Sequence, residues 1–134
     1  MLKHTFIVLI LLLAPVLCAA EERTATSSVH AGFLYPNGVD VAGYTVEQSI
    51  ADNVYYFYTF GFPSLAAAGL SYYTDYTGDG LSGAIGVGIG SVLYASLVYQ
   101  WKIADKQYLK TGAGFTTGIA YTGAYPALSY EYRF

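Results

Sequence analysis

The chain has 134 residues, of which 54% are hydrophobic and only 11% are charged, and its formal net charge is −3. No stretch is dense enough in Lys and Arg to neutralise a run of phosphates, which excludes nucleic acid as a partner. Fifteen tyrosines and fifteen glycines against four prolines favour strands and tight turns over helices.

The first twenty residues have the pattern of a secretory signal peptide. Lys3 and His4 form a short basic start, and an apolar run extends from Thr5 to Leu17. This run is shorter than the roughly 20 apolar residues of a spanning helix. Small residues in Cys18-Ala19-Ala20 predict cleavage after Ala20. Cleavage leaves one domain at residues 21–134, with 114 residues, no cysteine, five basic residues and nine acidic ones, a net charge of −4.

Alternation with a period of two, interrupted by turn residues, divides this domain into strands. One face of each strand has larger apolar side chains, and the other has Gly, Ser, Thr and the charged residues. The stretch from 54 to 62 is aromatic on both faces, so its orientation stays open. The first four strands are predicted at Thr24–Tyr35, Val39–Ile50, Val54–Phe62 and Ala66–Tyr76, with turns at Pro36-Asn37-Gly38, Ala51-Asp52-Asn53, Pro63-Ser64-Leu65 and Thr77-Gly78-Asp79-Gly80.

The run from Leu81 to Ile103 exceeds a tilted spanning strand of about 9–11 residues. We divide it at Gly90-Ser91-Val92, because a break of odd length keeps the alternation in phase. A turn at Ala104-Asp105-Lys106 leads into a strand over Gln107–Ala120, and Thr122-Gly123-Ala124 leads into the last strand, which ends at Phe134. The prediction is an all-β, eight-stranded antiparallel up-and-down transmembrane barrel with both termini of the domain at one end.

Six charged residues fall on the predicted inner face, near the strand ends that share this terminal end. Charges in a narrow lumen are costly unless they are paired, and three acids with three bases can pair without net charge. We favour a structural plug over a gate or a proton path, because eight strands leave an interior just wide enough for side chains to fill. A small ligand cavity is the alternative to a packed lumen. The six residues are Glu47, Asp75, Lys102, Lys110, Glu131 and Arg133.

His30 is the single histidine of the domain and a weak catalytic candidate. An enzyme would need a serine and a carboxylate, or similar partners, within hydrogen-bond reach of it, and no spacing in the sequence links such residues. No Cys, His and carboxylate spacing indicates a metal site. The glycines at 86, 88 and 90 continue a strand pattern rather than forming a nucleotide loop. We therefore expect neither a metal nor a cofactor.

The last strand is the most informative segment of the chain. Leu128, Tyr130, Tyr132 and Phe134 alternate with Ala127, Ser129, Glu131 and Arg133, as expected for a wall between lipid and a polar lumen. Other outward aromatic residues gather toward strand ends, where interfacial girdles form. They are Tyr44, Tyr72, Tyr76, Tyr99, Trp101 and Tyr121.

Together with the signal peptide and the alternating strands, the terminal Tyr132-Arg133-Phe134 resembles the small bacterial outer-membrane barrels of the OmpA/OmpX type. The resemblance covers residues 21–134 and implies a monomer in the bacterial outer membrane. It implies contact with outer-membrane lipid and lipopolysaccharide, and with periplasmic chaperones during export. It also implies that the barrel-assembly machinery reads Leu128, Tyr130, Tyr132 and Phe134.

Three classes of function stay open for such a barrel. We favour a structural, envelope-maintaining role without catalysis. The alternatives are a lipid A-modifying enzyme, which needs His30 near the outer leaflet with partners, and a narrow barrel for ligand binding or transport, which needs a continuous lumen. Short predicted outer loops argue against adhesion, because such loops carry partner contacts. A soluble barrel of lipocalin type would instead bury its apolar faces.

Overall fold

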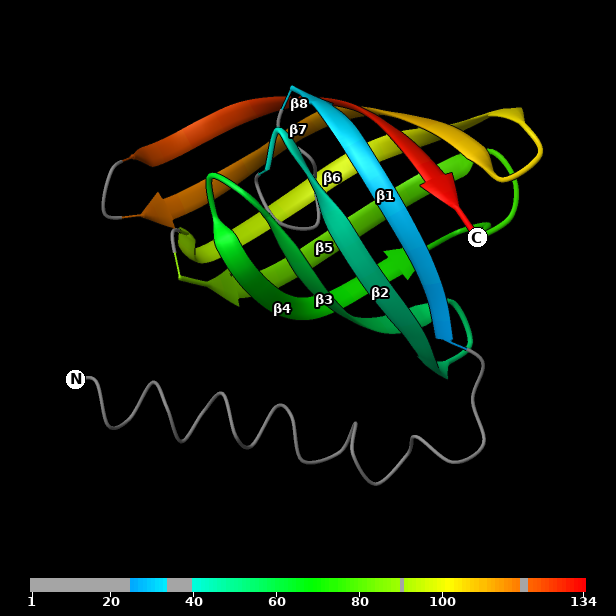
Figure 1. Ribbon diagram of the computed structural model, residues 1–134, viewed down its shortest axis with the longest axis horizontal. Helices are drawn as coiled ribbons and strands as arrows, with labels where there is room; N and C mark the ends of the chain where they lie inside the picture. The colour runs from blue at the N-terminus through cyan, green and yellow to red at the C-terminus, as the bar shows by residue number, and fades with distance from the viewer. Residues whose placement is uncertain (1–24, 34–39, 90, 119–120) are drawn as a thin grey trace.

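The computed structural model describes residues 25–33, 40–89, 91–118 and 121–134. In these residues, eight antiparallel strands pair in chain order, and β1 also pairs with β8, so the sheet closes into a barrel (Figure 1). The predicted all-β, up-and-down, eight-stranded architecture is confirmed. The strands are β1 (Ala25–Phe33), β2 (Ala42–Ala51), β3 (Val54–Phe62), β4 (Leu65–Tyr73), β5 (Gly80–Gly88), β6 (Ser91–Ala104), β7 (Gln107–Gly118) and β8 (Thr122–Arg133).

The two ends of the barrel differ in their connections. At the end where β8 stops, which we call the C-terminal mouth, β2 joins β3 and β6 joins β7 through two residues each. The second residue of each turn, Asn53 or Lys106, has a left-handed backbone with φ of 62° or 59°. The tight turns predicted at these two places are confirmed. At the other end, the opposite mouth, Pro63 and Ser64 join β3 to β4 after a cis peptide bond at Phe62-Pro63.

Several predicted boundaries are corrected by the pairing of the strands. β2 begins at Ala42, so Asp40 and Val41 precede this strand instead of belonging to it. β4 ends at Tyr73, so Thr74–Tyr76 belong to the connection to β5 rather than to the strand. β6 already begins at Ser91, and the break in the long apolar run therefore falls earlier than predicted. Thr122–Ala124 pair with residues of β7 and so form the start of β8 instead of a turn.

Some predictions fall on residues that the structure does not describe. These are the signal peptide over residues 1–20, the start of the first strand at residue 24, its end at 34–35, the turn at 36–38, the start of the second strand at residue 39, Gly90, and residues 119–120 at the end of the seventh strand.

The two faces of the wall follow the predicted alternation. In β8, Leu128, Tyr130 and Tyr132 are exposed on the outside, whereas Ser129 and Glu131 are buried in the lumen. The orientation of β3, which the sequence left open, is also fixed. Phe57 and Thr59 are fully buried in the lumen, and Tyr58, Phe60 and Phe62 are exposed.

Candidate functional site

The candidate site is a group of charged side chains in the lumen near the C-terminal mouth. Glu47 comes from β2, Lys110 from β7, and Glu131 and Arg133 from β8. Each stands on the inner face of its strand because successive side chains of a strand point to opposite faces. All four are buried. We call these four residues, with Tyr73 of β4, the charged network.

The network is continuous across the lumen. The Tyr73 hydroxyl donates a hydrogen bond to Glu47 Oε1 at 2.7 Å and accepts one from Lys110 Nζ at 3.2 Å. Lys110 Nζ forms an ion pair with Glu131 Oε2 at 2.8 Å. The other oxygen of Glu131 is bonded by Nε of Arg133. Side chains from four strands are thereby tied to one another.

Charge balance explains how these groups tolerate burial. Two acids and two bases sum to zero, and every ionised group has an oppositely charged neighbour or a hydrogen bond within the network. Burying an ion costs several kcal/mol unless such partners offset the loss of water, whereas removing one partner costs about 3–5 kcal/mol. The charged network thus links strands across the lumen, and each of its buried charges depends on its partners.

Two of the six predicted lumen charges do not join this network, which corrects the expectation for them. Asp75 is exposed in the β4–β5 connection, where its Oδ1 accepts the backbone N–H groups of Thr77 and Gly78, each at 3.0 Å. Lys102 is exposed on β6 beyond Gln100, which is the end of the pairing between β6 and β5. Both positions continue the alternation of the inner face, but they lie beyond the part of the barrel where β5 pairs with its neighbours.

Other residues near this mouth do not stand out in the sequence. Gln100 is fully buried, and its amide oxygen accepts a hydrogen bond from Arg133 Nη2 at 2.6 Å. Tyr108 is buried, with the Arg133 guanidinium 3.9 Å from its ring centroid. Tyr76, predicted on the outer face, instead stacks on Tyr55 with 4.3 Å between ring centroids. These residues are neutral, so a map of charges alone does not select them.

His30 lies in the lumen rather than on the outer wall. It is buried on β1, opposite Glu131 of β8 on one side and Gly43 of β2 on the other. A Cβ on Gly43 would stand 2.9 Å from Cε1 of the imidazole, so the glycine leaves the space that the ring fills. The position makes His30 part of the lumen packing.

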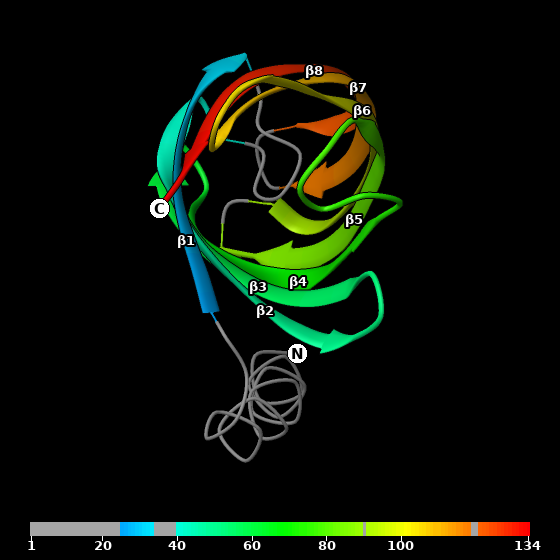
Figure 2. The same cartoon turned by 90° about the vertical axis from the view of Figure 1, so that its right-hand side faces the viewer.

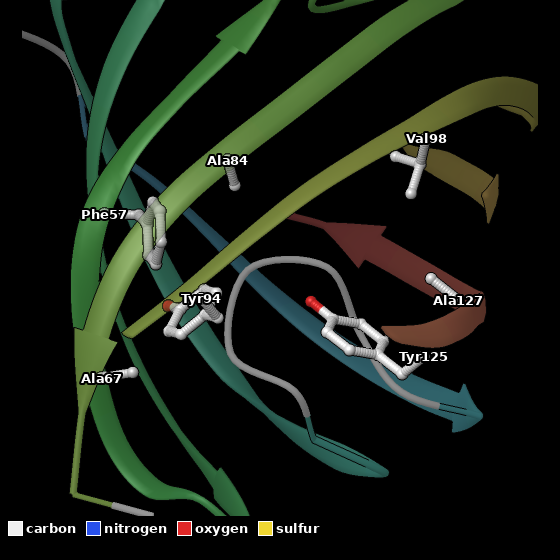
Figure 3. Close-up of a cluster of buried hydrophobic side chains, with 7 residues drawn as sticks. All are labelled: Phe57, Ala67, Ala84, Tyr94, Val98, Tyr125 and Ala127. Carbon is white, nitrogen blue, oxygen red and sulfur yellow. The ribbon is translucent and has the colours of Figure 1, made fainter. Parts of the chain in front are cut away.

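The half of the lumen toward the opposite mouth is filled mainly by aromatic and small residues. Tyr94 stands directly across the ladder from Gly86, and Tyr125 from Gly114, so that each ring lies over a glycine. Figure 3 shows these two rings with Phe57, each on a different strand, together with the smaller side chains of the cluster. Large and small residues therefore interdigitate here, as close packing requires.

One carboxylate, Asp40, is buried in this half. Its Oδ1 accepts hydrogen bonds from the Ser64 backbone N–H at 2.9 Å and from the Ser64 hydroxyl at 2.6 Å. Its Oδ2 has no hydrogen-bond partner in the described part of the chain and lies against Gly61. Burial raises the pKa of Asp40 above its ordinary value, and the two bonds from Ser64 oppose that rise. Unlike the acids of the network, Asp40 has no ion-pair partner among the described residues.

Within the described ranges, no group of three or more His, Cys, Asp or Glu residues is placed to hold a metal ion. No helix of the described residues is long and apolar enough to cross a membrane. Comparisons of the chain with protein-family models, with curated proteins and with solved structures find no match.

Proposed function

We propose that residues 21–134 form a small integral barrel of the bacterial outer membrane with a structural, envelope-maintaining role and no catalysis. Outer-membrane lipid and lipopolysaccharide surround the wall in this proposal, and the barrel acts as a monomer. The barrel-assembly machinery and periplasmic chaperones handle the chain before it folds, and the outer face of β8 is the segment that the machinery reads.

The observation behind this proposal is the inverted distribution of side chains. Large apolar residues are exposed on all eight strands, while serines, threonines and ion pairs are buried inside. A soluble barrel would need the reverse, because exposed apolar area of this extent favours aggregation in water. One exposed residue from each strand in order is Val29, Tyr44, Phe60, Leu65, Ile85, Leu97, Phe115 and Leu128.

Aromatic residues near the C-terminal mouth support the same proposal. The exposed Tyr130 hydroxyl donates to Gln107 Oε1 at 3.0 Å, and the Tyr44 hydroxyl donates to Ser27 Oγ at 2.7 Å. Phe134 packs beside Tyr44 and Tyr132, with ring centroids 6.3 Å and 6.2 Å away. Rings that face outward and keep their polar tips bonded match the girdle of a membrane barrel.

The filled lumen favours a structural role over transport. The charged network and Gln100 occupy the end near the C-terminal mouth, and the aromatic cluster occupies the other half. A conducting barrel needs a continuous aqueous path, which this packing opposes. The enzyme alternative needs His30 near the outer leaflet, and the lumen position of His30 gives that alternative no support.

A pair of arginine substitutions tests the proposal. Leu97 is 62% exposed in the middle of β6, whereas Thr77 is exposed in the β4–β5 connection. In lipid vesicles we expect Leu97→Arg to lower the free energy of unfolding by about 2–4 kcal/mol, as for an arginine near the bilayer midplane. Thr77→Arg, the matched control, leaves it nearly unchanged. Urea titration of both variants measures this difference, and equal stability of the two would refute a lipid-facing wall.

A further inference from the structure

The connection between β4 and β5, residues Thr74–Asp79, lies at the C-terminal mouth, and we call it the cap loop. Figure 2 faces this mouth and shows the green connection reaching over part of the opening. In the closed order of eight strands, the β4–β5 pair stands across the lumen from the β8–β1 pair. A contact between the cap loop and β8 therefore spans the mouth.

Three side chains hold the backbone of the cap loop: one from β6, the strand that pairs with β5, and two from β7 and β8 farther around the barrel. Gln100 Nε2 donates to the carbonyl oxygen of Gly78 at 2.9 Å and lies 3.3 Å from the carbonyl oxygens of residues 75 and 76. Arg133 Nη1 donates to the carbonyl oxygen of Tyr76. The Tyr108 hydroxyl donates to the carbonyl oxygen of Thr77 at 3.3 Å. The loop is thus fastened to β6, β7 and β8.

Ring contacts add to this fastening. The Arg133 guanidinium lies 4.1 Å from the ring centroid of Tyr76 and 3.9 Å from that of Tyr108. Tyr76 also meets Tyr73 edge to face, with 4.9 Å between centroids. A cation between aromatic faces gains attraction when water is excluded. These contacts turn the Tyr76 ring inward, over the charged network.

The cap loop separates solvent from the network. Asp75, Thr77 and Asp79 are exposed on one side of it, whereas Lys110 and Glu131 are fully buried on the other. β4 ends before the loop and β5 begins after it, so the bonds from Gln100, Arg133 and Tyr108 are no part of the sheet ladder. Breaking them leaves every strand pair in place.

We propose that the cap loop is a movable cap, latched by Gln100, Arg133 and Tyr108, which seals the C-terminal mouth. When it opens, water reaches Lys110 while the barrel wall stays closed. Segments with few ladder bonds open locally at lower free energy than the whole fold, and the cap loop is such a segment. The inference concerns the lumen and is independent of the membrane proposed above.

Acylation of lysines in the folded, detergent-solubilised protein tests the cap. Lys106 is exposed at the same mouth and serves as the internal reference for the buried Lys110. A water-soluble amine-reactive ester, followed by peptide mass spectrometry, gives both rates in one sample. In the unmodified protein, we expect Lys110 to react at least about tenfold more slowly than Lys106.

Two variants then release the cap by different routes. Gln100→Ala removes the side chain that bonds the loop carbonyls, and Tyr76→Ala removes the inward ring, which contacts the Arg133 guanidinium, while every charged residue of the network is kept. We expect either change to raise the Lys110 rate several-fold while Lys106 is unaffected. Gln107→Ala, whose side chain bonds Tyr130 on the outer wall, is the matched control and leaves both rates unchanged.

Heat-modifiable migration identifies the variants that keep a closed wall, and only these are scored. If one variant does not fold, the other still decides the question. The proposal is overturned if Lys110 stays as slow in a folded cap variant as in the unmodified protein. Reaction of Lys110 as fast as Lys106 in the unmodified protein overturns it as well, because the mouth would then not be sealed.

Discussion

The two halves of the lumen accommodate buried polar groups in different ways. Near the C-terminal mouth, Glu131 is shared by Lys110 and Arg133, and the four charges of the network cancel. Near the opposite mouth, Asp40 is hydrogen-bonded by Ser64 alone among the described residues and lies against Gly61. The stability of the first half depends on charges that compensate one another, and the stability of the second half depends on the fit between large and small side chains. We therefore expect substitutions in the two halves to change the free energy of unfolding by different mechanisms and by different amounts.

The largest effect is expected for Glu131→Gln. The amide keeps the volume but removes the charge that Lys110 and Arg133 share, which leaves two buried cations with one buried acid. We expect a loss of about 3–5 kcal/mol in the free energy of unfolding, measured by urea titration. Asp105→Asn, in the exposed turn between β6 and β7, is the control and should have no effect. An unchanged urea midpoint for Glu131→Gln would show that the charges do not depend on one another.

A smaller loss is expected from Gly86→Ala, which tests the packing of the other half. The added Cβ would lie 2.5 Å from the Tyr94 hydroxyl oxygen and 2.9 Å from the carbonyl oxygen of Ala68. Overpacking of this kind costs about 1–3 kcal/mol. Gly83→Ala is the control, because its nearest new contact is 3.4 Å away. In a Tyr94→Ala background the cost of Gly86→Ala should shrink, and equal costs in both backgrounds would contradict the ring-over-glycine account.

The smallest effect is expected from Asp40→Asn, and it depends on pH. Burial raises the pKa of the Asp40 carboxyl, so the folded protein holds this proton more tightly than the unfolded chain does. That contribution to stability is present below the ordinary pKa of 3.8 and is lost as the pH rises through the higher folded value. The asparagine keeps an acceptor for Ser64 and has no charge to bury. At neutral pH the variant should equal or exceed the unmodified protein in stability, and that advantage should vanish in acid.

Asp52→Asn, in the exposed turn between β2 and β3, is the control for this pH series. If Asp40→Asn is strongly destabilising at neutral pH and neutral in acid, then the Asp40 charge is compensated. The two halves of the lumen would in that case not differ as described.

The sequence predicts the faces of this barrel and both ends of β3, but it misplaces the ends of several other strands, including β4. Alternation identifies Glu47, Lys110, Glu131 and Arg133 as inner residues because a strand places every second side chain on one face. Parity alone does not tell where a ladder stops. Tyr76 follows the end of β4, where the alternation no longer holds, and its ring turns toward Arg133.

Other features depend on contacts between segments that are far apart in the sequence. Gln100 becomes important only because the cap loop brings backbone carbonyls to it from 22 to 25 residues away. Asp40 lies outside β2, and its burial follows from the position of Ser64 after β3. Neither contact changes the alternation of residues within a strand. The alternation therefore predicts neither of them.

The proposed contact between the apolar outer wall and lipid can be measured at a single residue. The chain has a single tryptophan, Trp101, which is 47% exposed on the outer face of β6 toward the C-terminal mouth. Its fluorescence should be quenched by lipids brominated near the headgroups, more weakly by lipids brominated at the chain ends, and little by aqueous iodide. Strong quenching by iodide with none by any brominated lipid would contradict a lipid-facing outer wall.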